Sequence, residues 1–248
     1  MNRKPLGKLP KKFDIQNRTL QLAKYLPPAL PVIPSSQDWL TRGASNWGMA
    51  ANDRIGDCTC AALSHMIQVW TSSVGDEVTI PDEEVVRMYS AISGYVPGDP
   101  STDRGAYCLD ALKYLRSTGL AGHKIRAFAE VNPKHHAMVR AALWLGGGLY
   151  VGATIYDNIW DQEVWDAPPP SARVEGGHAL NVGALAAGDA DLAFITWAFR
   201  QGATRRWWDE CVDECYILLS DDALDNAGRT MAGFDTAQLL EDLSLVTQ

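Results

Sequence analysis

The sequence lacks both the long apolar run and the excess of basic residues that two large classes of protein need. No stretch reaches the roughly 18–20 apolar residues of a membrane-spanning helix, so we expect no membrane span. Acidic residues number 30 against 22 Lys and Arg, and a net charge of −8 argues against nucleic acid as a partner. The charged N-terminus is followed by no apolar run, which is atypical of a Sec signal peptide.

Cysteine is also scarce and unevenly placed. The five cysteines include two local pairs, Cys58 with Cys60 and Cys211 with Cys215, and they form no spread disulfide framework. Free thiols in the cytoplasm or another reducing compartment are the simpler interpretation, and delivery by a route without a Sec signal stays open. Cys211 and Cys215 have the spacing of one helical turn, but no His stands nearby to complete a zinc site. We therefore predict neither a metal nor a cofactor.

Composition divides the chain into three parts. Residues 1–34 contain six prolines and are expected to form an extended arm, with a short helix at residues 16–25. Residues 35–220 carry the patterns of a folded domain. Residues 221–248 form an acidic tail, in which we expect a short helix at residues 236–243.

The folded part changes character halfway along. Apolar residues at helical spacing predict helices over residues 58–71 and 107–117, and Pro81 followed by three acidic residues predicts a helix start. Later runs rich in Val, Ile, Tyr and Trp predict strands. The expected later elements are strands at 124–130, 149–155, 178–185, 192–197 and 214–220, a helix at 133–145 and a loop at 157–174. A helical half (35–123) before a β-rich half (124–220) indicates an α+β protein.

The most informative stretch is the polar loop that leads directly into Cys58. The helical pattern begins at this cysteine, and the positive end of a helix dipole favours thiolate over thiol. Asn52, six residues upstream, carries an amide that can fold back beside the sulfur as an oxyanion donor. A small cysteine just inside a helix is also common in protein cores. Cys58 alone therefore leaves a catalytic and a packing interpretation open.

His178 supplies a possible partner for this thiol. Gly176 and Gly177 precede it and leave room for close approach, and an apolar strand follows it. A neutral imidazole there can lie beside Cys58 and accept its proton. A lone histidine at a strand end is more often structural, but a cysteine at a helix start with a histidine at a later strand start is typical of a catalytic pair.

The order and spacing of these motifs resemble those of the papain-like cysteine peptidases. The matching positions are Asp38-Trp39, Gly43-Ala44, Asn52 where the family has Gln, Cys58, Ala61-Ala62, His178-Ala179, Gly183, Trp197 and Tyr216. The resemblance covers roughly residues 34–220. It implies a two-lobed fold, in which a central helix of the N-terminal lobe starts at Cys58 and the C-terminal lobe is an antiparallel β-rich unit.

The resemblance also implies a reaction and a role for each site residue. Cys58 is expected to be the nucleophile and His178 the general base and then acid, with Asn52 and the Cys58 backbone amide as the oxyanion hole. The reaction implied is hydrolysis of an amide bond through a thioester. The substrate would be a peptide or protein bound in a cleft between the lobes. The sequence gives no indication of the oligomeric state.

The chain departs from the family's pattern at two informative positions. Ile195 stands where the family places the Asn that orients its histidine, and Asn52 is one methylene shorter than Gln. The polar residues that can substitute as the orienting group are Thr196, which is nearest, and Asp189, Asp191 and Asn181. Two further hypotheses therefore stay open. One is an amidase, transamidase or deubiquitinase-like enzyme with the same pair, and the other is a binding or structural protein whose pair is idle.

Overall fold

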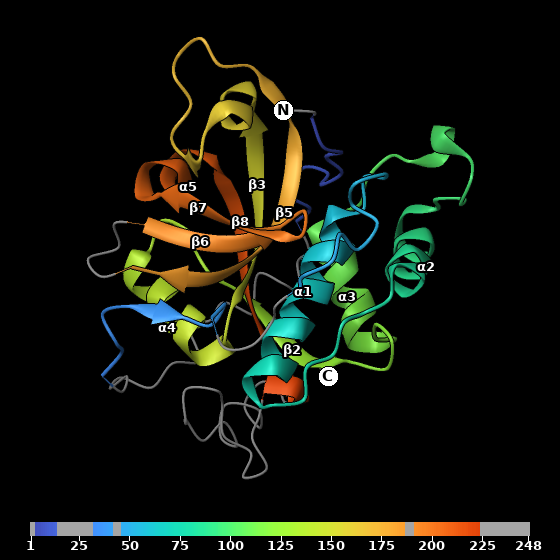
Figure 1. Ribbon diagram of the computed structural model, residues 1–248, viewed down its shortest axis with the longest axis horizontal. Helices are drawn as coiled ribbons and strands as arrows, with labels where there is room; N and C mark the ends of the chain where they lie inside the picture. Colours follow the sequence, from blue (N-terminus) through green and yellow to red (C-terminus); the bar gives the residue numbers. More distant parts are fainter. Residues whose placement is uncertain (1–2, 14–31, 42–45, 187–190, 224–248) are drawn as a thin grey trace.

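The computed structural model describes residues 3–13, 32–41, 46–186 and 191–223. The helices predicted at residues 16–25 and 236–243 lie outside these ranges, as does most of the acidic tail. In the described part the chain forms a group of helices beside an eight-stranded sheet (Figure 1). Among the described residues, no helix has the length and apolar character needed to cross a membrane.

Three helices, α1 (Cys58–Ser73), α2 (Asp82–Ser93) and α3 (Cys108–Ser117), form the helical group, as predicted. α2 begins directly after Pro81 with three acidic residues in its first turn, where they face the positive end of the helix dipole. α1 lies between the other two helices and the sheet (Figure 1). Every residue of α1 except Ser73 is buried, as expected for a helix that is covered on all sides.

The sheet has the strand order β2-β8-β3-β5-β6-β7-β4, with β1 paired to β5. Its strands are β1 (Gln37–Asp38), β2 (Ile125–Glu130), β3 (Leu149–Tyr156), β4 (Val164–Trp165), β5 (Val174–Leu185), β6 (Asp191–Thr196), β7 (Phe199–Thr204) and β8 (Val212–Ser220). All pairs are antiparallel except β4 with β7. Two helices, α4 (His136–Gly146) and α5 (Arg205–Cys211), contribute apolar residues to the core on the sheet side.

The structure corrects the predicted layout after residue 157. The predicted loop contains β4 and a 3₁₀ turn, and β5 begins at Val174, four residues before the predicted start. β7 and α5 were not predicted. Cys211 and Cys215 do not share a helical turn, because α5 ends at Cys211 and Cys215 lies in β8. The short α5 begins where the Thr204 hydroxyl accepts a hydrogen bond from the Trp207 backbone.

Two apolar cores meet at α1 and the central strands. Side chains alternate in direction along a strand, so β5 contributes to both cores: Ala179 to the helical core and Leu180 to the sheet core. The fully buried Trp70 of α1 ties them together, since its indole N–H donates a 2.9 Å hydrogen bond to the Gly146 carbonyl. The last turn of α1 is thereby held against the end of α4, while Cys58 at the start of α1 shares the helical core with Ala179 of β5.

A buried polar network fixes the loop that precedes α1. The Asp103 carboxylate accepts a hydrogen bond from the Gly56 backbone at 2.9 Å and from the Tyr89 hydroxyl at 2.5 Å. The same hydroxyl accepts a 2.9 Å hydrogen bond from the Gly105 backbone. Tyr89 therefore joins α2 to the loop before α1, through Asp103 and Gly56, and to the chain before α3, through Gly105.

We expect Tyr89→Phe to lower the free energy of unfolding by about 1–3 kcal/mol, because it leaves a buried Gly105 N–H and an Asp103 oxygen without their partner. Urea titration measures this. Tyr95→Phe is the matched control: its ring packs on Tyr89, but its hydroxyl has no hydrogen-bond partner in the described part of the chain. An equal effect of the two substitutions would contradict the role assigned to the network.

Candidate active site

Cys58 is the first residue of α1 and is almost completely buried. Burial raises the pKa of its thiol to about 11, and hydrogen bonding from the backbone of Ala179 and Gly7 offsets this only in part. In this conformation Cys58 is therefore a neutral thiol at neutral pH. The dipole of α1 favours the thiolate, but removal from water has the larger effect.

His178 lies in β5 and is equally buried. Its Nε2 shares a 2.7 Å hydrogen bond with the Thr196 hydroxyl, and its ring stacks on Trp197 with the centroids 4.4 Å apart. Its Nδ1 has no hydrogen-bond partner among the described residues. Burial, and to a lesser degree the charge of His65, lowers the pKa of His178 to about 3, so the imidazole is neutral.

The packing of α1 against β5 brings the strand that carries His178 up to Cys58. Ala179, which directly follows His178, reaches the Cys58 thiol with its backbone. Because Nε2 is engaged by Thr196, Nδ1 is the ring nitrogen that remains available to a thiol. The structure thus gives His178 a polar partner despite the Ile195 position, through the hydroxyl one residue later.

Trp197 is held over His178 by an unusual turn between β6 and β7. Trp197 and Ala198 both have positive φ, 46° and 66°, which matches the tight two-residue turn favoured between antiparallel strands. Positive φ is unfavourable for residues with a side chain, and such strain is often found at functional sites. The turn places the indole against the face of the imidazole and shields it from solvent.

The other polar residues considered as orienting groups are not placed on His178. Asn181 is buried three residues along β5 and therefore points to the opposite face of the strand. Asp191 is exposed at the start of β6, and Asp189 lies outside the described residues. Among the described residues, Thr196 is the partner that hydrogen bonds to the ring.

Asn52 is buried in the loop before α1, and its amide has a local partner. Its Nδ2 donates a 3.1 Å hydrogen bond to the Ile55 carbonyl, and the amide also favours the charged form of the neighbouring Asp57. The geometry therefore shows Asn52 bracing the loop. Its role as an oxyanion donor stays a prediction.

Asp57 was not singled out from the sequence, although it directly precedes Cys58. Its carboxyl is completely buried, and neither oxygen has a well-aligned hydrogen-bond partner in the described part of the chain, although the Asn52 amide offsets the effect of burial in part. Burial is the larger effect: it raises the pKa of Asp57 well above its usual value and favours the protonated form. The only signal for Asp57 in the sequence was its position between Gly56 and Cys58 at the start of a predicted helix.

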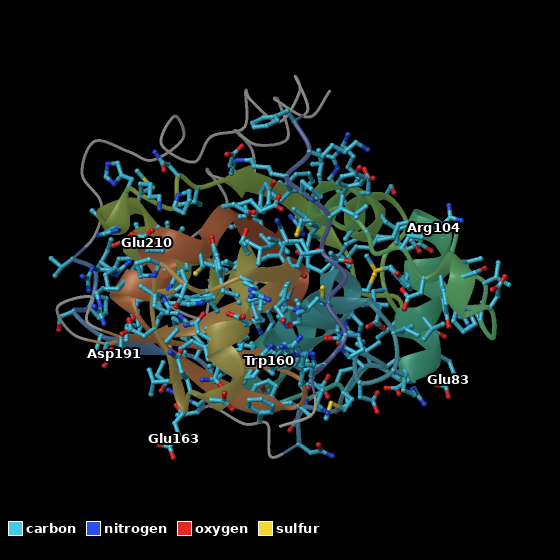
Figure 2. All side chains as sticks on the ribbon, turned by 90° about the horizontal axis from the view of Figure 1, so that it is seen from above. Glu83, Arg104, Trp160, Glu163, Asp191 and Glu210 are labelled. Atoms are coloured by element: carbon cyan, nitrogen blue, oxygen red, sulfur yellow. The ribbon has the colours of Figure 1, made fainter. Side chains whose placement is uncertain are left out.

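An N-terminal segment, residues 3–13, covers the site. Figures 1 and 2 show this deep-blue segment running along the boundary between the helical group and the sheet. Its backbone bonds to both sides: Lys8 N–H donates to the Gly177 carbonyl at 3.0 Å, and the Gly7 carbonyl accepts from Ala106 N–H at 2.8 Å. Gly7 also touches Gly56, since a Cβ at Gly7 would lie 1.7 Å from the Gly56 carbonyl oxygen. The arm predicted from proline content is extended here, and it occupies the boundary where a substrate was expected.

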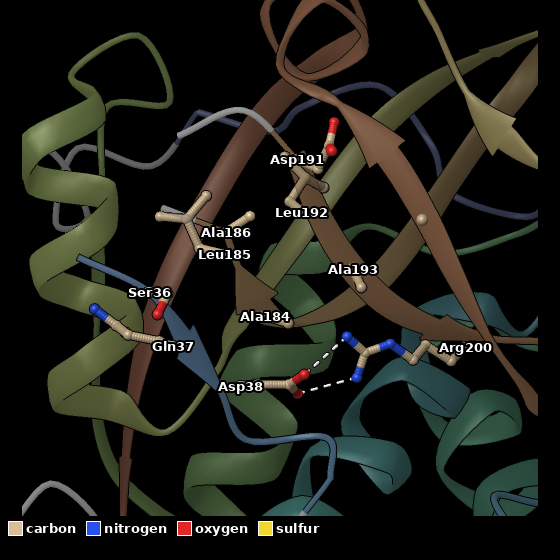
Figure 3. Close-up of a pocket in the computed structure, with 11 residues that line it drawn as sticks. Ser36, Gln37, Asp38, Ala184, Leu185, Ala186, Asp191, Leu192, Ala193 and Arg200 are labelled. Atoms are coloured by element: carbon tan, nitrogen blue, oxygen red, sulfur yellow. Dashed lines mark hydrogen bonds and ion pairs between the residues drawn. The ribbon is translucent and has the colours of Figure 1, made fainter. Parts of the chain in front are cut away.

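Two cavities lie elsewhere on the sheet. One, of about 490 Å³, is crossed by the bidentate Asp38–Arg200 ion pair and contains neither Cys58 nor His178 (Figure 3). The other, of about 410 Å³, is walled by aromatic side chains that include Trp197 and Trp160, the latter labelled in Figure 2. Through Trp197 it borders the ring of His178. No cluster of three metal-binding side chains occurs within the described ranges.

The chain matches no protein-family model and no curated protein, but its fold matches solved structures. Xylellain, a cysteine protease from Xylella fastidiosa, superimposes with a TM-score of 0.69 at 16% identity, over 88% of this chain and 98% of that one. Procathepsin B from Trypanosoma congolense gives 0.57 at 12% identity, over 88% and 87%. A cysteine protease from Carica candamarcensis gives 0.54 at 12% identity, over 75% and 99%. The chain therefore has the two-lobed α+β fold of the papain-like cysteine proteases, as the sequence predicted.

The two buried histidines predict a loss of stability in mild acid. Burial lowers the pKa of His65 to about 4 and of His178 to about 3, from an ordinary value of 6.5. Between pH 6.5 and 4 the unfolded chain takes up protons that the folded chain does not. Stability should therefore be complete above pH 6.5 and fall by about 1.4 kcal/mol per pH unit for each histidine below it.

Urea unfolding at pH 7, 6 and 5 tests this, with His65→Gln/His178→Gln as the comparison. The double variant should lose most of the slope of stability against pH. Asp57 acts in the opposite direction, because its raised pKa adds stability as pH falls, so the difference between the two chains is the decisive quantity. Equal slopes would show that neither histidine is held neutral by the fold.

Proposed function

We propose that this chain is a thiol-dependent hydrolase, a cysteine peptidase that cleaves amide bonds with Cys58 and His178. One observation carries the proposal. His178 is hydrogen bonded through Nε2 to Thr196, which leaves Nδ1 without a partner among the described residues, and the backbone of the next residue, Ala179, contacts the Cys58 thiol. The start of a helix, a free ring nitrogen and an oriented imidazole are the parts that thiol catalysis needs. The papain-like fold supports the same conclusion.

The proposed reaction follows from this arrangement. With Nε2–H donating to Thr196, Nδ1 accepts the Cys58 proton while the sulfur attacks the amide carbonyl carbon. The oxygen becomes an oxyanion next to the N-terminus of α1, where backbone N–H groups point outward. Nδ1 then gives its proton to the departing amine and leaves a thioester. Water, deprotonated by His178, cleaves the thioester, releasing a carboxylic acid and restoring the thiol.

The conformation described is a closed one. The N-terminal segment contributes to the burial of Cys58 through Gly7, and burial opposes charge on both members of the pair, raising one pKa and lowering the other. A neutral thiol beside a neutral imidazole is a poor nucleophile. Hydrolysis therefore requires the segment to move away, which admits both substrate and water.

Gly7→Ala should open the site, because the added Cβ would meet the Gly56 carbonyl oxygen at 1.7 Å. We expect iodoacetamide to label Cys58 at least tenfold faster in this variant than in the unmodified chain, measured by peptide mass spectrometry near neutral pH. Pro10→Ala, at an exposed position of the same segment, is the matched control and should change the rate less than twofold.

Cys60 and Cys108 serve as internal references, because both are buried thiols with raised pKa values. If Cys58 in the opened chain reacts no faster than these two, the nucleophile assignment fails. Cys58→Ala in the opened chain should abolish hydrolysis of a fluorescein-labelled casein. Full hydrolysis by that variant would be equally damaging to the proposal.

Thr196→Val should lower kcat/KM of the opened chain about 10- to 100-fold, because it removes the hydroxyl that orients the His178 ring while preserving side-chain shape. Thr196→Ser keeps the hydroxyl and should retain most of the activity. The pH dependence of Cys58 labelling gives a second readout, since an unfixed imidazole shifts the apparent pKa of the pair. Identical rates and pH profiles for the Val and Ser variants would rule out a positioning role for Thr196.

A further inference from the structure

The N-terminal segment places one charged side chain in an unusual position. The Lys8 side chain is only 2% exposed, and its Nζ lies 2.9 Å from Asp213 Oδ2 and 3.1 Å from Glu214 Oε1. Burial of an ammonium group is costly unless it is paired. Burial alone lowers the pKa of Lys8, but Glu214, with Cys108 and Asp213, raises it above its ordinary value. The surroundings of Lys8 therefore favour a cation.

Glu214 belongs to the folded body and is prepared for this cation. Its side chain is 1% exposed in β8, and the Tyr216 hydroxyl donates a 2.9 Å hydrogen bond to Oε2. Its Oε1 has no hydrogen-bond partner among the described residues and faces the Lys8 ammonium. A buried carboxylate oxygen without a cation would be strongly disfavoured. Asp213 adds a second negative charge at a position one-third exposed.

Glycine residues provide the space that the Lys8 side chain fills. Gly152 of β3 is the register partner of Glu214, and a Cβ there would lie 2.3 Å from Lys8 Cε and 2.6 Å from Glu214 Cγ. A Cβ at Gly177 would lie 2.3 Å from the Lys8 carbonyl oxygen. Gly177 thus leaves room for the Lys8 backbone, and Gly152 leaves the space, here called the channel, that the Lys8 side chain fills as far as the Glu214 carboxylate.

The backbone around Lys8 is bound as an extended peptide. Lys8 N–H donates to the carbonyl of Gly177, the residue before His178, while Ala106 on the helical side bonds to Gly7 and Leu9. These carbonyl and N–H groups carry no information about side chains, so another extended peptide can use them equally well. A side chain that enters the channel would then lie next to the proposed catalytic pair.

We propose that this channel is the specificity pocket of the enzyme, that it selects a lysine or arginine side chain of the substrate, and that Lys8 fills it in the closed state. Glu214 is the specificity-determining residue, and Asp213 supports it at the rim. The assignment rests on the proposed function for its biological meaning, but the selectivity of the pocket is a binding property that exists without catalysis.

The other lysines of the segment show that Lys8 is distinctive. Lys12 pairs with Asp110, but its side chain is 46% exposed, and Lys11 pairs with a partly exposed Glu130. Exposed pairs of this kind contribute little. A general attraction between a basic segment and an acidic protein would not bury Lys8 to 2% exposure while Lys11 stays 18% and Lys12 46% exposed.

A binding measurement tests the pocket on the full-length Gly7→Ala/Cys58→Ala chain, in which the site is open and no chemistry can occur. The probe is a fluorescent synthetic peptide with the sequence of residues 3–12, and its binding is measured by fluorescence anisotropy. We expect a Lys8→Met peptide to bind at least tenfold more weakly, because it keeps the aliphatic length and loses the charge. A Lys12→Met peptide is the control and should bind within about twofold of the parent.

Glu214→Gln in the same chain should reduce the preference for the parent over the Lys8→Met peptide to less than threefold. Should Gly7→Ala fail to fold or to speed Cys58 labelling, Lys8→Glu in the full chain replaces it, since it sets a like charge against Glu214. Equal binding of the two peptides, an unchanged preference in Glu214→Gln, or no binding by either opened chain would overturn the inference. Absence of hydrolysis with preserved peptide selectivity would instead contradict only the proposed function.

Discussion

The contact between the start of α1 and the beginning of the apolar part of β5 is the interaction on which the rest depends. It joins the helical core to the sheet core, because Cys58 and Ala179 share one cluster while Leu180 turns into the other. At the other end of α1, Trp70 adds a second attachment to the sheet side by donating to the Gly146 carbonyl at the end of α4. A thiol and an imidazole separated by more than a hundred residues are thereby placed at one seam. The fold fixes where these two residues lie, and burial, to which the covering segment contributes, shifts their pKa values.

Under the proposed function, the covering segment would keep the Cys58–His178 pair unreactive. Exclusion of water disfavours the thiolate and the imidazolium together, so closure suppresses the charge separation that nucleophilic attack needs. The segment is fastened by backbone bonds on both lobes and by one buried ion pair. Specific recognition and suppression of reactivity are thus two results of the same set of contacts. If the proposed pocket binds a basic side chain of the substrate, the Lys8 side chain occupies the position of that side chain in the closed state.

Local patterns predicted most of the fold, and they named the candidate site residues, whose roles stay predictions. The start of α1 at Cys58 and the acidic start of α2 follow from helix-terminus chemistry, and the papain-like arrangement is confirmed. β7 and α5 were missed because they are short and rich in polar residues, so they lack a hydrophobic period. Their structure depends on packing of Trp207 and Trp208 in the sheet core.

The features that sequence could not supply all depend on contacts between distant segments. Lys8 and Glu214 are separated by most of the chain, and neither stands in a recognisable motif. Asp57 is completely buried, and the Gly56 backbone before it bonds to Asp103, a contact between distant parts of the chain that no local pattern indicates. Thr196 was considered as the orienting group, but only the register of β6 beside β5 puts its hydroxyl on His178.

The contact between Gly7 and Gly56 has an evolutionary consequence. The two backbones approach this closely because residue 7 has no side chain, whereas a Cβ at position 56 would still lie 3.2 Å from the Gly7 Cα. A single codon change that adds a Cβ at position 7 would therefore set the segment against the loop before α1. Selection for the covered arrangement would act on position 7 more strongly than on position 56.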